Sequence, residues 1–333
     1  SHRFIKVSSL FDKIKSSTEK KEYMQIKDVF HLKILFFLFI ILEFCSLDFS
    51  KYSLLDTLHD GDYLTPLINY KNFNGFWSSS FTIHGGRDLF IPVIANKLFG
   101  SQNFASIKFV YIFLIFIIKF FSIILSYQIS QISNLNKNLK IVIFAFSCPF
   151  LLSLSSYEQN DYFNIRDLFV VIFFITFIQI FIKKNNWILI YLLSLIPTVA
   201  LFFHYDTGIY LNIILLSYFV YLGICKNYQD LLKIFFFLTL NYIFFYFYFG
   251  ETEIINFLKQ ITHIINNIDM IHGLEYPRPF FSIGEVSDSA RGTKLLVFFV
   301  LAGFAINLLV FSKNEFINSK KKFLIIFIYL YSL

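Results

Sequence analysis

The amino-acid sequence predicts an all-α polytopic membrane protein with about nine transmembrane helices, and three observations support this fold class. Hydrophobic residues make up 56% of the 333 residues and charged residues only 15%, so a soluble fold would expose mostly hydrocarbon. Several apolar runs reach the length of roughly 17 to 25 residues that a helix needs to cross a bilayer. Nearly all loop carboxylates fall on one side of these runs. We therefore expect the lipid bilayer to be the solvent and partner of this chain.

The first predicted element is a basic tail over 1–30, followed by a single transmembrane domain over 31–333. The apolar residues of the tail share one helical face, which favours a position on the anionic inner leaflet: Phe4, Val7, Phe11 and Ile14. The predicted spans lie near 32–49, 109–127, 140–156, 168–183, 187–203, 208–225, 233–249, 294–312 and from 323 onward. Because the chain starts at Ser1 and stops inside an apolar run at Leu333, we expect it to be part of a longer protein.

The distribution of lysines predicts the orientation of the spans. With the N-terminus in the cytoplasm, the inner loops are basic and contain Lys137, Lys140, Lys183, Lys184, Lys226, Lys233, Lys313, Lys320, Lys321 and Lys322. Only Asp230 and Glu315 oppose them, as the positive-inside rule requires. Insertion topology thus explains the net charge of +7, and we expect no nucleic-acid partner. No cleavable signal peptide precedes the first span, so we expect a permanent anchor in a multi-pass protein.

Four outer loops follow from this orientation, at roughly 50–107, 157–167, 204–207 and 250–293. The first loop contains two predicted surface helices, Tyr63–Tyr70 and Arg87–Phe99, and the second of these ends at Gly100. The composition of Arg87–Phe99 predicts a helix lying along the membrane surface. Its apolar residues are Leu89, Phe90, Val93 and Leu98, and its polar residues are Arg87, Asp88, Asn96 and Lys97. The fourth loop begins with a predicted surface helix, Glu251–Asp269. We expect the first loop to form a small folded cap.

The motif Asp60-Gly61-Asp62 follows directly after the first span, flanked by His59 and Tyr63. In an extended or turn segment, two such carboxylates can converge on a divalent cation, Mg²⁺ or Mn²⁺, or can divide the roles of base and ligand. Gly61 gives the backbone freedom to turn between them. A solvated Asp-rich turn is the alternative interpretation of the same motif. We take Asp60 and Asp62 as the candidate catalytic residues and as the candidate metal ligands.

Further polar residues of the outer loops are candidates for substrate binding, because charges this close to hydrocarbon must pair or line a wet cavity. They are His59, Tyr63, His84, Arg87, Glu158, Asp161, Arg166, His204, Asp206 and Arg278. Arg278 lies between two prolines and is the favoured clamp for a phosphate, with a surface role holding the loop as its alternative. Arg166 pairing with Asp167 or Asp206 is the structural alternative for that group. The outer histidines show no metal-ligand spacing, so we do not expect zinc.

Two other features of the spans carry no predicted function. Lys119 lies inside the second span, where a lone ammonium is costly, and it is assigned no role. Cys45, Cys148 and Cys225 lie in or at the ends of apolar spans with no paired spacing. We therefore expect packing roles for the cysteines, with no disulfide framework.

The order of these features resembles the GT-C superfamily of polyprenyl-phosphate-dependent glycosyltransferases. The resemblance covers most of the chain as architecture and depends on one short motif, Asp60-Gly61-Asp62, after the first span. An aspartate of the first outer loop is the catalytic centre in that superfamily, so the resemblance implies this role for Asp60 or Asp62. It also implies a polyprenyl-phosphate-linked sugar donor, a glycan, lipid or protein acceptor, and a bacterial inner (plasma) membrane. Other members carry a large soluble domain that this segment does not contain.

Three alternatives to a glycosyltransferase remain open from the sequence. A polysaccharide polymerase or ligase would depend more on outer arginines than on an early Asp-x-Asp motif. A transporter or flippase would place charged residues deep within the spans, or break helices with Gly or Pro. Lys119, Pro149 and Pro197 are the candidates for such features here. A purely structural scaffold would explain neither the folded first loop nor the acidic residues in three outer loops.

Overall fold

The computed structural model describes residues 30–47, 57–82, 84–100, 104–132, 137–154, 165, 167–182, 186–224 and 226–267. These residues are almost entirely helical and contain no strand, so the all-α prediction is confirmed for this part of the chain. A helix over 30–45 comes first. It is followed by α2 (Thr57–Phe73), α3 (Arg87–Phe99), α4 (Phe104–Ile132), α5 (Lys137–Leu154), α6 (Asp167–Ile182), α7 (Trp187–Phe203), α8 (Tyr205–Ile224), α9 (Tyr228–Phe249) and α10 (Glu251–Asn266).

Three stretches of these helices are long and apolar enough to cross a membrane: Phe104–Gln131, Tyr205–Gly223 and Tyr228–Phe249. Three shorter apolar helical stretches accompany them: Asn138–Pro149, Asp167–Ile180 and Trp187–Phe203. Each of the predicted spans from 32–49 to 233–249 overlaps a helix of the structure. The predicted spans 294–312 and 323 onward, and the amphipathic tail up to 29, lie outside the described residues.

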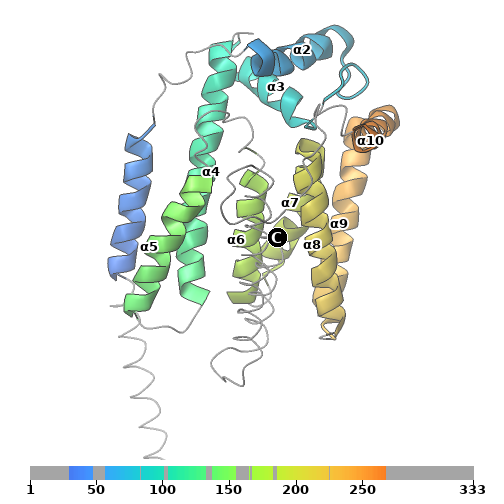
Figure 1. The fold of residues 1–333 in the computed structure, drawn as a ribbon. Helices are drawn as coiled ribbons and strands as arrows, with labels where there is room; N and C mark the ends of the chain where they lie inside the picture. Colours follow the sequence, from blue (N-terminus) through green and yellow to red (C-terminus); the bar gives the residue numbers. More distant parts are fainter. Residues whose placement is uncertain are drawn as a thin grey trace, which may run out of the picture.

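The main core lies between α4, α6, α7 and α8, which run side by side along the bundle (Figure 1). Fully buried residues there include Phe177, Leu193 and Leu211. The long helix α9 buries only Ile234 and Asn241 and leaves most of its large apolar side chains exposed. An apolar face of this kind is unfavourable in water and typical of contact with lipid.

Helices α2, α3 and α10 lie across one end of the bundle (Figure 1). Helix α3 packs on α4 through Ile91, Ala95 and Tyr111, among other buried residues. Its predicted limits are confirmed, because Gly100 takes the left-handed conformation (φ 63°) and donates its N–H to the Asn96 carbonyl. Helix α2 contains the predicted helix Tyr63–Tyr70 but extends beyond it at both ends.

Burial along α3 does not follow the division into apolar and polar residues. Arg87 and Asp88, two polar residues of the predicted surface helix, are only 1% and 3% exposed, whereas the apolar Leu98 is 68% exposed. Arg87 and Asp88 pair with each other, so burial does not leave either charge unmatched. The pattern of apolar and polar residues therefore does not identify the buried side of this helix, because an ion pair allows charged residues to be buried.

The ammonium of Lys119 has a partner in the first described helix. Its Nζ atom lies 2.9 Å from Oε2 of Glu43, and both side chains are largely buried. The ion pair joins the helix over 30–45 to α4, beside an apolar cluster that includes Leu32, Phe144 and Cys148. Cys148 is thus a packing residue as predicted, Cys45 is exposed, and Cys225 lies outside the described residues.

Candidate functional site

The loop that follows α2 is held against the corner where α7 ends and α8 begins. The N–H of Gly86 donates to the Phe202 carbonyl at 2.9 Å. A Cβ atom at Gly86 would lie 2.5 Å from that same carbonyl oxygen, and Gly85 has a φ of +106°, which side chains rarely tolerate. The two glycines therefore allow the loop between α2 and α3 to approach the end of α7 closely.

Two residues after Gly86, the carboxylate of Asp88 accepts hydrogen bonds from His84 and Arg87, which are close to it in the sequence. Its Oδ2 atom accepts the backbone N–H of His84 at 3.2 Å and lies 3.4 Å from Nδ1 of the same histidine. Its Oδ1 atom accepts Nε–H of Arg87 at 3.2 Å. The carboxylate orients the imidazole and holds the guanidinium beside it. His84 is the more accessible of the three, with 24% of its side chain exposed.

Neighbouring groups keep the carboxyl group of Asp88 ionised although it is buried. Burial by itself would raise the pKa of the carboxyl group, because desolvation disfavours the charged form. The hydrogen bond from His84 and the positive charge of Arg87 outweigh that effect, so the pKa lies below its ordinary value. Asp88 is consequently a carboxylate at neutral pH, and it presents a fixed negative charge to His84.

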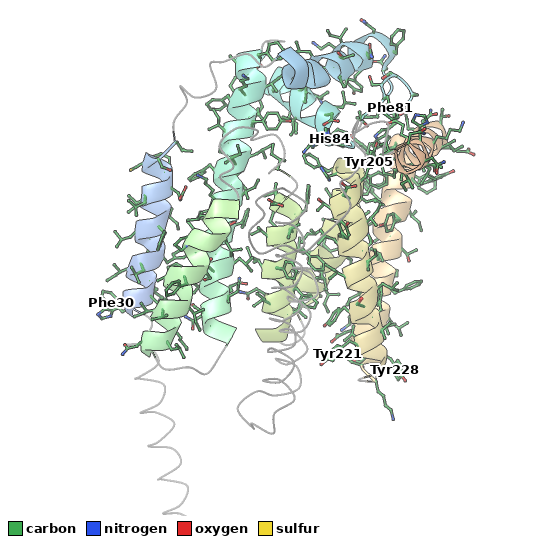
Figure 2. The ribbon with its side chains drawn as sticks, viewed as in Figure 1. Phe30, Phe81, His84, Tyr205, Tyr221 and Tyr228 are labelled. Atoms are coloured by element: carbon green, nitrogen blue, oxygen red, sulfur yellow. The ribbon has the colours of Figure 1, made fainter. Side chains whose placement is uncertain are left out.

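The bundle contributes His204 and Thr207 to this site. His204 is the C-cap of α7 and is 4% exposed. Its ring stacks against that of His84, with a centroid distance of 6.4 Å and an interplanar angle of 27°, while Nδ1 lies 3.4 Å from Oγ1 of Thr207. We refer to His84, Arg87, Asp88, His204 and Thr207 as the polar corner. Figure 2 shows His84 near Tyr205 at the end of the bundle that α2, α3 and α10 cover.

Helix α10 also holds the loop between α2 and α3, through hydrogen bonds of two of its side chains. The Glu253 carboxylate accepts the backbone N–H groups of Trp77 and Ser78 at 2.6 and 3.1 Å, and it also accepts the Ser78 hydroxyl. The Gln260 amide donates to the carbonyls of Trp77 and Ser80, both at 2.7 Å. These bonds satisfy backbone groups that would otherwise be unpaired in an irregular loop. We refer to Glu253 and Gln260 with these partners as the α10 clamp.

An aromatic cluster fills the space beneath the α10 clamp. The ring of Trp77 is 4.8 Å from that of Phe257 on α10 and 6.0 Å from that of Phe202 on α7. Phe249, at the end of α9, packs 4.7 Å from Trp77. The loop between α2 and α3 thus packs against α7, α9 and α10, all of which lie more than 100 residues after it in the sequence.

Asp60 and Asp62 belong to the first turns of α2, and the predicted extended or turn segment is wrong. On a helix, positions two apart do not share a face, so this backbone does not bring the two positions together as a turn around Gly61 would. The side chains of 57–63, which include His59 and Tyr63, lie outside the described part of the structure. The convergence of the two carboxylates on a cation therefore stays a prediction.

The other candidate residues separate into three groups. His84, Arg87 and His204 come together in the polar corner, as a shared outer site would require. Asp206, two residues after His204, is exposed and lies in the first turn of α8. Glu158, Asp161, Arg166 and Arg278 lie outside the described residues. Among the described side chains, no group of three His, Cys, Asp or Glu is placed to hold a metal ion.

Sequence reasoning missed Asp88, Glu253 and Gln260 as parts of the site. A signal existed for Asp88, because it follows His84 by four residues, a spacing at which side chains on a helical turn can meet. No local signal existed for Glu253, whose partner Ser78 lies 175 residues away in the sequence. Such a contact is visible only after the loops have been assembled in space.

The geometry of the polar corner suits proton transfer and the binding of negative charge. An imidazole that is hydrogen-bonded to a carboxylate through Nδ1 can exchange a proton at Nε2, and a buried arginine adds positive potential next to it. Comparison of the chain with protein-family models, with curated proteins and with solved structures finds no match. The arrangement of these residues is therefore the basis for assigning a function.

Proposed function

We propose that this protein is an integral membrane glycosyltransferase that moves a sugar from a polyprenyl-phosphate carrier to an acceptor hydroxyl. One observation supports the proposal above the others. Helix α2, which carries Asp60 and Asp62, lies with α3 across the same end of the bundle as the polar corner (Figure 1). Helix α2 and the polar corner thus share the end of the bundle where the lipid boundary would lie.

The proposed orientation places this end of the bundle outside the cell. The N-terminus is then cytoplasmic, in the inner membrane of a bacterium, and about nine spans cross the bilayer. Glycan, lipid or protein hydroxyls are the acceptors available on that side.

In the proposed reaction, one aspartate of α2 accepts the proton of the acceptor hydroxyl. The acceptor oxygen forms a bond to the anomeric carbon as the bond between that carbon and the carrier phosphate breaks. The phosphate leaves with the bonding electron pair, and positive potential from Arg87 and a hydrogen bond from His84 stabilise its charge. Asp88 keeps both of these groups in position.

The helical conformation of α2 separates the expected roles of Asp60 and Asp62. Helix α2 rotates by about 100° per residue, so Asp60 and Asp62 are separated by about 200° around its axis. Only one of the two positions can face the polar corner. We expect that residue to be the base and the other to affect transfer weakly.

The test measures transfer of labelled sugar from polyprenyl-phosphate donors in membranes that contain the full-length protein. Variants Asp60→Asn and Asp62→Asn are compared at equal abundance, with Glu251→Gln as a control that removes an exposed outer carboxylate. We expect one aspartate variant to lose at least about 100-fold in rate, and the control to match the wild type. Unchanged transfer in both aspartate variants would contradict the proposal.

A transporter is the second candidate, because Lys119 and Glu43 form an ion pair within the predicted spans. Ionisable pairs within a membrane often mark the path of a substrate or a proton. Transport of a lipid-linked sugar across vesicles, abolished by Lys119→Met with no transfer from any donor, would favour this candidate. Sugar transfer that survives in the Lys119→Met variant would favour the glycosyltransferase.

A further inference from the structure

Helix α10 changes direction sharply where it leaves the membrane-length helix α9. Gly250 joins the two helices with φ 86° and ψ 159°, a conformation open to glycine. As a result α10 lies across the end of the bundle rather than continuing along it (Figure 1). A helix that follows directly on a spanning segment in this way is placed at the level of the lipid headgroups.

The α10 clamp sets which side of α10 faces the protein. Phe257 and Gln260 are 2% and 8% exposed and pack against the loop that contains Trp77. Glu253 also faces that loop. The opposite side of the helix is therefore turned outward.

An open hollow of about 440 Å³ follows that outward side. It is lined by Ile255, Leu258, Lys259, Thr262, His263 and Asn266, which form one continuous stripe of the helix. Ile255 and Leu258 are 43% and 55% exposed, so they offer apolar surface at one end of the hollow. Lys259 lies directly beside Leu258 and supplies an ammonium group, and the amide of Asn266 lies at the other end of the hollow. The hollow thus has an apolar part and a cationic part.

No carboxylate neutralises the charge of this hollow within the described residues. Lys259 has no acidic partner there, and none of the six lining residues is acidic. The Glu253 carboxylate is held by Trp77 and Ser78 on the other side of the helix. Glu251 lies eight residues before Lys259, about 12 Å along the axis. The hollow is therefore complementary to a negative charge joined to a hydrocarbon chain.

We propose that the outward stripe of α10 binds an anionic phospholipid of the bilayer. The headgroup phosphate pairs with Lys259, the amide of Asn266 donates a hydrogen bond to it, and the acyl chain lies over Ile255 and Leu258. The bound lipid covers apolar surface of α10 that faces away from the protein. The site does not depend on the proposed transfer reaction.

Native mass spectrometry of the delipidated full-length protein in detergent tests this proposal. The protein is incubated with equal amounts of phosphatidylglycerol and phosphatidylcholine that carry the same acyl chains. We expect preferential retention of phosphatidylglycerol, reduced about fivefold by Lys259→Gln. Leu258→Asn should reduce retention of both lipids, and the control Lys97→Gln, which removes an exposed lysine of α3, should match the wild type.

Two further measurements decide between possible occupants of the hollow. Inorganic phosphate at millimolar concentration should not displace the lipid, because it lacks the acyl chain. Equal retention of the two lipids, or unchanged preference in the Lys259→Gln variant, would overturn the proposal. A dimer that dissociates in the Leu258→Asn variant would also overturn it, because a second copy of the chain would then occupy this face.

Discussion

At the scale of single residues, Asp88 determines the chemistry of the polar corner. Its carboxylate is almost fully buried and accepts hydrogen bonds from the Arg87 side chain and the His84 backbone. Hydrogen bonds to an ionised group are stronger than neutral ones, and removal of this charge takes one counter-charge away from the buried guanidinium of Arg87. Asp88 therefore helps to stabilise Arg87 inside the protein.

We predict that Asp88→Asn lowers the free energy of unfolding by about 2 kcal/mol at neutral pH, because Arg87 loses the counter-charge of Asp88. Thermal or denaturant unfolding of the protein in detergent measures the change. Asp206→Asn is the control, since this exposed aspartate supports only the start of α8, and its effect should be below about 1 kcal/mol. Equal effects of the two variants would contradict the assigned role.

The dependence on pH follows from the lowered pKa of Asp88. The unfolded chain takes up this proton near the ordinary value of 3.8, whereas the folded chain takes it up only at lower pH. The contribution of Asp88 to stability is complete above that value and is lost as the pH falls through the folded pKa. We expect the difference between the wild type and Asp88→Asn to persist down to about pH 4 and to shrink below it. A difference that already vanished at pH 6 would contradict this prediction.

At the scale of elements, the cap is attached to the bundle at a small number of close contacts. Gly85 and Gly86 let the loop between α2 and α3 meet the end of α7, and the α10 clamp holds the same loop through Glu253 and Gln260. The described residues of this loop, 74–82 and 84–85, form no strand or helix, so these contacts satisfy several of its backbone groups. The position of His84 next to His204 depends on both attachments.

We predict that Gly86→Ala destabilises the protein by about 1 to 3 kcal/mol, because the added methyl group would contact the Phe202 carbonyl and the Phe90 ring. Unfolding of the variant in detergent measures the loss. Gly223→Ala is the matched control, since nothing lies within 4 Å of its new methyl group and alanine favours the helix. The control should be neutral or slightly stabilising. A neutral Gly86→Ala variant would show that the loop does not need this close approach.

At the scale of the whole molecule, the helices of the bundle hold the polar groups of the polar corner together. The helix over 30–45 is joined to that bundle by the pair between Glu43 and Lys119. Breaking such a pair on one side leaves a charge in an apolar environment, whereas removing both charges leaves none. The ion pair therefore links the helix over 30–45 to α4, because each of the two charges is stabilised by the other.

We predict that Glu43→Gln and Lys119→Met each destabilise the protein, and that the double variant is more stable than the sum of the two losses implies. The physical reason is that each single change leaves one unpaired charge among the helices. Unfolding measurements on the four proteins give the interaction energy. Strictly additive effects would show that the two groups do not interact in the membrane.

The sequence by itself determined the type and the approximate limits of the helices. Apolar runs of sufficient length led directly to the positions of α4 to α9, and Gly100 correctly marked the end of α3. These features are predictable because they depend on neighbours along the chain, where hydrophobic length and glycine conformation act locally. The sequence also placed His84, Arg87 and His204 among the candidates for one outer site.

Only the tertiary structure decided which polar groups meet. It buried Arg87 and Asp88 of the predicted surface helix, placed Asp60 and Asp62 on a helix, and joined Glu253 to Ser78 across 175 residues of sequence. A buried charge is tolerated only with a partner, and that partner can come from any part of the chain. Local patterns of polarity do not show which distant groups meet, so the contact between His84 and His204 and the α10 clamp follow from three-dimensional packing.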